Sequence, residues 1–134
     1  MPSIYQLSDG RVVGVIERSG QTATVEMPPN GGRTTVPVDQ LHDLSDPFAT
    51  LGTQLPTSLV EDFTLSAQRS RGVVLYVFCW GPVTVKELLA VGEWCERECN
   101  GVLAELRVAG CLESATMPGA DFAVTDAVRA QFRS

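Results

Sequence analysis

The run Val73-Val74-Leu75-Tyr76-Val77-Phe78-Cys79-Trp80, followed by Gly81-Pro82 and Val83-Thr84-Val85-Lys86-Glu87-Leu88, decides how the second half of this chain folds. Its first eight residues have the composition of either a buried strand or a buried helix. The context favours a helix, because Gly81-Pro82 is a stop signal and Thr84 can cap a short helix directly after it. We therefore predict a first helix from Ser66 to Trp80 and a second one from Thr84 to Gly92.

A third helix is predicted after Trp94, with Cys95 at its N-cap. Cys99, Leu103 and Leu106 recur at spacings of four and three, which places them on one apolar stripe. Gly110 is suited to a left-handed C-cap, and a strand begins at Cys111. A turn at Pro118-Gly119, a returning strand at Phe122-Ala123-Val124 and a last helix capped by Thr125 and ending near Phe132 complete the pattern.

This order of elements resembles the winged helix-turn-helix of MarR- and ArsR-type regulators, over about 70 residues from roughly Phe63 to Ser134. The residues that carry the resemblance are Gly81–Leu88, Val102–Glu113 and Phe122–Thr125. The resemblance implies that the third helix enters the major groove of double-stranded DNA and that the wing, with its tip at Met117 to Asp121, touches the DNA backbone or the minor groove. The implied function is DNA binding in transcription regulation, without a cofactor.

The DNA-contacting residues implied by the resemblance are Lys86, Arg97, Asn100 and Arg107, and Glu96 and Gly101 share the exposed face of the third helix. Glu96 and Glu98 lie in the first turn of that helix, where they suit the helix dipole but repel phosphates. The wing has no Lys or Arg. These acids favour an alternative function, a protein–protein adaptor that uses the winged-helix surface or the N-terminal barrel groove.

The N-terminal region reads as short strands. An apolar β-branched run at Val12 to Ile16, an alternating series from Thr22 to Met27 and a third strand from Arg33 to Val38 are separated by Asp9-Gly10, Ser19-Gly20 and Pro28–Gly32 turn signals. With a tight turn at Val38–Leu41, they resemble a small SH3-like β barrel. We therefore expect an α+β chain.

Three regions follow from this division: a β unit at residues 1–44, a linker at 45–57 and the winged helix at 58–134. The linker is inferred from Pro47, Gly52 and Pro56 and from its weak periodicity. Ser58 to Glu61 is a possible capping box at the start of a short helix.

The composition narrows the class of protein. The 134-residue chain is 44% hydrophobic and 19% charged, which is typical of a folded domain. A formal charge of −6 disfavours tight nonspecific binding of nucleic acid. No apolar run is long enough to span a membrane, and the first residues do not resemble a signal region, so a cytoplasmic protein is expected.

Four cysteines, Cys79, Cys95, Cys99 and Cys111, lack the Cys-x-x-Cys spacing of metal sites. Packing as small buried hydrophobes is favoured over metal or redox roles, except for Cys95, because exposed thiols at helix N-termini are the more reactive ones.

No nucleophile motif, phosphate loop or carboxylate pair indicates an enzyme, and His42 reads as a solvated loop residue. Arg69, Arg71 and Lys86 can be grouped with Arg97 as a small basic face, but scattered surface charge is the favoured interpretation. A third interpretation is that the β unit binds the ligand and the winged helix only dimerises, with the apolar run from Val73 to Trp80 as the face of a homodimer.

Overall fold

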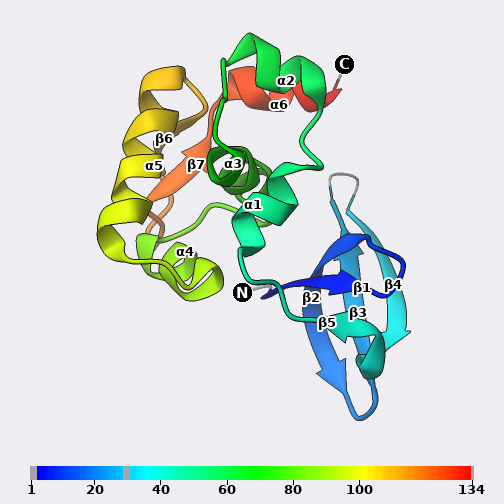
Figure 1. Cartoon of the computed structure of the whole chain (residues 1–134). Helices are drawn as coiled ribbons and strands as arrows, with labels where there is room; N and C mark the ends of the chain where they lie inside the picture. Colours follow the sequence, from blue (N-terminus) through cyan, green and yellow to red (C-terminus); the bar gives the residue numbers. More distant parts are fainter. Residues whose placement is uncertain (1–2, 29–30, 134) are drawn as a thin grey trace.

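The computed structural model describes residues 3–28 and 31–133 (Figure 1). Its elements are β1 (Ser3–Leu7), β2 (Val12–Ser19), β3 (Thr22–Met27), β4 (Gly32–Pro37), the 3₁₀ helix η1 (Val38–Gln40), β5 (Leu41–His42), α1 (Pro47–Gly52), α2 (Thr57–Asp62), α3 (Gln68–Trp80), α4 (Val85–Gly92), α5 (Glu96–Ala109), β6 (Leu112–Ser114), β7 (Phe122–Val124) and α6 (Asp126–Arg133). The α+β expectation is confirmed: an antiparallel sheet comes first and helices follow.

The N-terminal sheet has five strands in the order β4-β3-β2-β1-β5, and every adjacent pair is antiparallel. The three predicted strands are confirmed as β2, β3 and β4, and the predicted turn after them is η1. Two strands were missed. β1 alternates only over five residues, and β5 is two residues long, so neither gives a pattern that stands out in the sequence.

The two faces of the sheet are buried against different partners. One face forms a small core of its own from Leu7, Val13, Val15, Ala23, Val25 and Val36. On the other face, Ile4 and Val12 join the core of the helical region. Burial on both faces explains why β2 begins with an unbroken apolar run instead of an alternating one.

Trp80 is the main anchor between the sheet and the helices. A Cβ on Gly14 of β2 would lie 2.5 Å from the Trp80 ring, so the indole occupies the place of a side chain on that strand. The ring also packs against Tyr76 one turn earlier in α3, with centroids 5.2 Å apart. Trp80 is therefore packed on both sides, by β2 and by its own helix.

The segment predicted as a linker, residues 45–57, contains α1, and in this respect the linker interpretation is wrong. Asp46 caps the helix by accepting a hydrogen bond from the Ala49 amide (3.3 Å), and Pro47 occupies the first turn. Phe48, Leu51 and Gly52 are buried. The glycine that suggested a flexible linker is instead required by packing.

That packing is the crossing of α1 over α3. A Cβ on Gly52 would lie 2.1 Å from the Gln68 carbonyl oxygen, and a Cβ on Gly72 would lie 1.8 Å from that of Phe48. Real Cβ atoms do not approach backbone so closely, so the two helices meet backbone to backbone.

The ambiguous run from Val73 to Trp80 is helical, as the context predicted. Residues Val73 to Val77 are buried within the chain, against α1, α5 and β7 among others. Because Val73 to Val77 are already covered, this part of the run does not offer a surface to a second copy, whereas Phe78, Cys79 and Trp80 are only partly buried.

The helix starts and stops after α3 mostly follow the sequence. Thr84 caps α4 by accepting from the Glu87 amide (3.1 Å), Cys95 caps α5, and Gly110 has the expected positive φ of 85°. The prediction of a capping box at Ser58–Glu61 is wrong, because α2 starts at Thr57 after Pro56 and has no side-chain cap. The hydroxyl of Thr125 donates to the Gly110 carbonyl (2.7 Å), which ties the start of α6 to the end of α5.

After α5 the chain forms the β6–β7 hairpin, and a third backbone segment joins it. Val83, between α3 and α4, exchanges two backbone hydrogen bonds of 3.0 Å with Phe122 of β7. The hairpin is thereby attached to the turn that precedes α4. Within residues 3–28 and 31–133, no helix has both the length and the apolar character needed to cross a membrane.

The α1–α3 crossing generates a stability prediction. Gly72→Ala should lower the free energy of unfolding by about 2 kcal/mol or more, because overpacking against the Phe48 backbone outweighs a helix-propensity gain of about 1 kcal/mol. Urea unfolding followed by circular dichroism measures the change.

Gly101→Ala is the matched control, since nothing lies within 4 Å of a Cβ at that mid-helix position. It should raise stability by roughly 0.5–1 kcal/mol. A Gly72→Ala protein as stable as the wild type would contradict the close crossing.

Candidate functional site

The candidate site is the surface formed by α4, α5 and the β6–β7 hairpin. Between α4 and α5 the chain turns sharply at Glu93, which has a positive φ of 53°. The Trp94 indole nitrogen donates to the Leu88 carbonyl (2.9 Å), and its ring lies 5.2 Å from that of Phe48. Trp94 thus links the turn between α4 and α5 to α1.

The orientation of α5 is set by its apolar stripe. Cys99, Leu103 and Leu106 are fully or almost fully buried. Helical periodicity therefore turns Arg97, Gly101 and Ala104 to the opposite side, where they are exposed. The other residues proposed from the resemblance, Lys86 on α4 and Asn100 and Arg107 on α5, are exposed as well.

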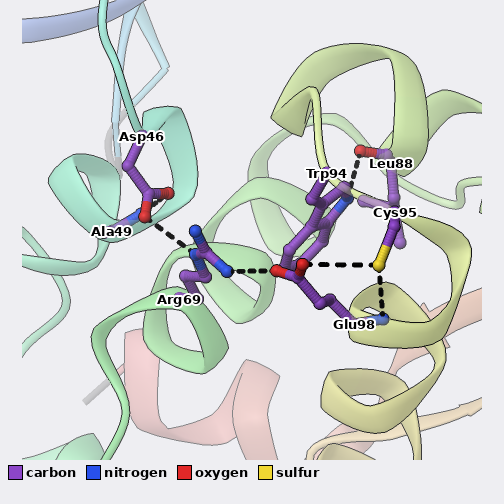
Figure 2. A network of polar contacts seen from close by, with 7 residues as sticks. All are labelled: Asp46, Ala49, Arg69, Leu88, Trp94, Cys95 and Glu98. Atoms are coloured by element: carbon purple, nitrogen blue, oxygen red, sulfur yellow. Dashed lines mark hydrogen bonds and ion pairs between the residues drawn. The ribbon is translucent and has the colours of Figure 1, made fainter.

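A polar network fixes one flank of α5 against α3 and α1 (Figure 2). The Arg69 guanidinium of α3 donates through Nε to Asp46 (2.8 Å) and through Nη1 to Glu98 (2.6 Å). It also lies over the Trp94 ring, 5.7 Å from the centroid. Glu98 is consequently turned toward α3 and has its charge offset by Arg69.

A second carboxylate of α5 also forms a hydrogen bond to α3. Glu105 accepts a hydrogen bond from the Ser70 hydroxyl (3.1 Å), and Ser70 is the one buried polar residue in the described part of the chain. Two of the three acids in α5 therefore bond to α3, and among the described residues Glu96 makes no such bond. This pairing changes the electrostatic picture that the sequence suggested for the helix.

The opposite flank of α5 faces the hairpin. The Arg107 guanidinium lies over the Phe122 ring of β7, 5.9 Å from its centroid. Asp121, just before β7, accepts a hydrogen bond from the Val85 amide in the first turn of α4 (2.9 Å). The hairpin and the start of α4 are thus connected by a side chain as well as by Val83.

The structure does not assemble the basic face of Arg69, Arg71, Lys86 and Arg97 that was weighed from the sequence. Arg69 bonds to Asp46 and Glu98, and the Arg71 Nε donates to the Leu65 carbonyl (2.7 Å). His42 is exposed in β5 and hydrogen-bonds through Nε2 to the Ser8 hydroxyl (3.0 Å). None of these pairings was readable from the sequence, because the partners lie 6 to 34 residues apart.

The four cysteines lie in different surroundings. Cys99 and Cys111 are buried, Cys79 is partly buried and Cys95 is exposed. Burial raises the pKa of Cys79 to about 12 and those of Cys99 and Cys111 to about 11, with Glu26 and Glu96 adding to the effect at Cys79 and Cys99. Across the residues that the structure describes, no three His, Cys, Asp or Glu side chains are grouped to hold a metal ion.

Comparisons with known proteins give one match. A model for a family of unknown function, DUF7346, matches residues 3–133. No curated protein and no solved structure matches the chain.

The cysteine environments predict which thiol reacts first. At mildly alkaline pH a disulfide-exchange reagent should label Cys95 rapidly, because its Sγ is exposed at the N-cap of α5, where it bonds only to Glu98 among the described residues. The other three stay protonated and shielded, since the thiolate is the nucleophile. Cys95→Ser should remove the fast phase from the absorbance trace. Labelling of Cys95 at or below the rate of the other three would refute the prediction.

Proposed function

This chain belongs to the DUF7346 family, whose function is unknown, and we propose from its geometry that α3 to α6 form a winged helix that binds double-stranded DNA through α5 in transcription regulation. The N-terminal sheet, with its own small core and η1 between β4 and β5, is proposed to be the SH3-like unit that accompanies it.

The order of elements supports the winged helix. A long helix, a single bridging residue at Val83, two helices, a hairpin and a final helix follow one another. In this proposal α5 is the recognition helix and the hairpin is the wing, which is the arrangement that lays a helix in the major groove.

The observation that carries the DNA proposal is that the exposed carboxylates of Glu98 and Glu105 bond to side chains of α3. With these carboxylates bonded to Arg69 and Ser70, the outward side of α5 holds Arg97, Asn100, Gly101 and Ala104, followed one turn later by the exposed Val108. Gly101 and Ala104 leave the centre of this side without bulk, which suits close approach to a groove. Arg69, which Glu98 shares with Asp46, offsets part of the acidic charge in the first turn of α5, whereas Glu96 keeps its charge on the exposed side.

Each exposed polar residue has a role suited to its chemistry. Arg97 can donate two hydrogen bonds to a guanine edge, and the Asn100 amide can pair with an adenine edge. Lys86, in the first turn of α4, and Arg107, on the hairpin flank, are placed to contact phosphates. The wing brings no cation, so phosphate contacts come from the helices alone.

A second function, a protein–protein adaptor, is favoured by two exposed apolar side chains. Val108 on α5 is 90% exposed and Met117 in the hairpin is 58% exposed. The formal charge of −6 also suits a partner other than a polyanion. DNA binding and adaptor function give opposite results in the experiments that follow.

The DNA proposal predicts distinct effects for two cations. On the best duplex selected from a randomised pool, Arg97→Ala should weaken binding by roughly tenfold to a hundredfold and relax sequence preference. Lys86→Ala should weaken all duplexes alike and reduce the slope of log K against log salt by about 1. Fluorescence anisotropy at several salt concentrations measures both.

Arg11→Ala is the control, because Arg11 lies in the β1–β2 turn, paired with Asp9 at 2.7 Å. It should bind DNA like the wild type. If micromolar wild-type protein binds no duplex at low salt, the DNA proposal fails and the adaptor function is favoured.

A further inference from the structure

The outer edge of β4 is an open sheet edge. β4 is the last strand in the order β4-β3-β2-β1-β5, and Figure 1 shows it at the outer margin of the sheet. Gly32, Arg33, Thr34 and Thr35 are all exposed, and only Val36 of this strand enters the core. Among the described residues, no strand pairs with the side of β4 that faces away from β3.

The alternation of hydrogen-bonded and non-bonded pairs between β3 and β4 shows which backbone groups of β4 face away from β3. The Val38 amide donates to the Gln21 carbonyl (2.8 Å), in register with the Ala23–Val36 and Val25–Thr34 pairs. Because hydrogen-bonded and non-bonded pairs alternate along an antiparallel ladder, Val36 and Thr34 point their backbone groups at β3. Arg33 and Thr35 therefore point theirs away from the sheet.

These outward groups have no partner in residues 3–28 and 31–133. Proteins usually protect a sheet edge with a bulge, a proline or charges. Here the register of β4 with β3 is regular, and the proline comes only at Pro37, beyond the two outward residues. The one charge, Arg33, is already paired with Glu26 of β3 (3.2 Å).

We infer that β4 is a self-pairing edge, and that its occupant is β4 of a second copy of this chain. An antiparallel pair with its two-fold axis at Thr34 sets Arg33 of each copy opposite Thr35 of the other. The two N–H and two C=O groups of each copy then meet, giving four hydrogen bonds between the strands. Centring the axis on Thr35 would instead oppose Arg33 to Pro37, which has no N–H.

Charge also suits a second copy. Each Arg33 brings its Glu26 partner to the shared sheet, so the pairing adds no unpaired charge at the junction. Thr34 meets Thr34 on one face, and Thr35 lies beside Arg33 on the other. Cross-strand threonine pairs of this kind are favourable. This dimer goes beyond the proposed function and does not depend on DNA binding.

Thr35→Pro tests the pairing directly. It removes an outward N–H while leaving the β3–β4 ladder intact, because the Thr35 amide does not point at β3. In sedimentation equilibrium up to high micromolar concentration, the wild type should rise from 14.4 kDa toward twice that mass. Thr35→Pro should stay monomeric, and the control Thr35→Val, which keeps the amide, should dimerise like the wild type.

A cross-link gives a second readout that does not depend on how the proline variant folds. In a Cys95→Ser background, Thr34→Cys places two thiols at a non-bonded pair, where Cα atoms lie about 4.5 Å apart, within disulfide range. Oxidised glutathione should convert it to a covalent dimer, whereas Ser66→Cys, exposed before α3, should not dimerise. A wild type that stays monomeric, or a Thr34→Cys protein that does not cross-link, would overturn the inference.

Discussion

The backbone contact between α1 and α3 is the constraint on which the rest of the helical region depends. Gly52 and Gly72 meet the opposite helix where no side chain fits, so the two axes lie as close as backbone atoms allow. This closeness lets Phe48 reach both Tyr76 and Trp94, with ring centroids 5.6 and 5.2 Å away. Since α3 is buried along most of its length, its position then sets those of α5, β7 and, through Trp80, the sheet.

From α3 the constraint passes to the surface of α5. Burial of Cys99, Leu103 and Leu106 supplies the stabilising free energy, because fully buried apolar side chains contribute about 1.5–3 kcal/mol each. The Arg69–Glu98 pair is half exposed and contributes little, on the order of 0–1 kcal/mol. The pair matters because it orients side chains. Together with the Ser70–Glu105 bond, it holds two carboxylates of α5 against α3, and Arg97 and Asn100 remain on the outward side of α5.

Features that depend on neighbouring residues were predictable from the sequence. The Thr84 and Cys95 caps, the Gly110 C-cap and the strands around Ser19-Gly20 follow from local hydrogen bonding and backbone freedom. α1 was read as a linker because Pro47, Gly52 and Pro56 fall in a stretch of weak periodicity, and the packing reason for Gly52 lies in α3. The bonds that two acids of α5 make to α3 were not predictable either. Glu98 and Glu105 find partners 29 and 35 residues away, and one sequence carries no signal for such pairs.

We propose that α3 orients α5 so that the outward side of α5 recognises DNA. Amide chemical-shift mapping is the most direct test of this proposal. An isotope-labelled chain is titrated with its preferred duplex while every backbone amide is followed. The largest shifts should fall on Arg97, Asn100, Gly101 and Ala104, with smaller ones at the start of α4. Shifts confined to the N-terminal sheet, or none at saturating duplex, would contradict it.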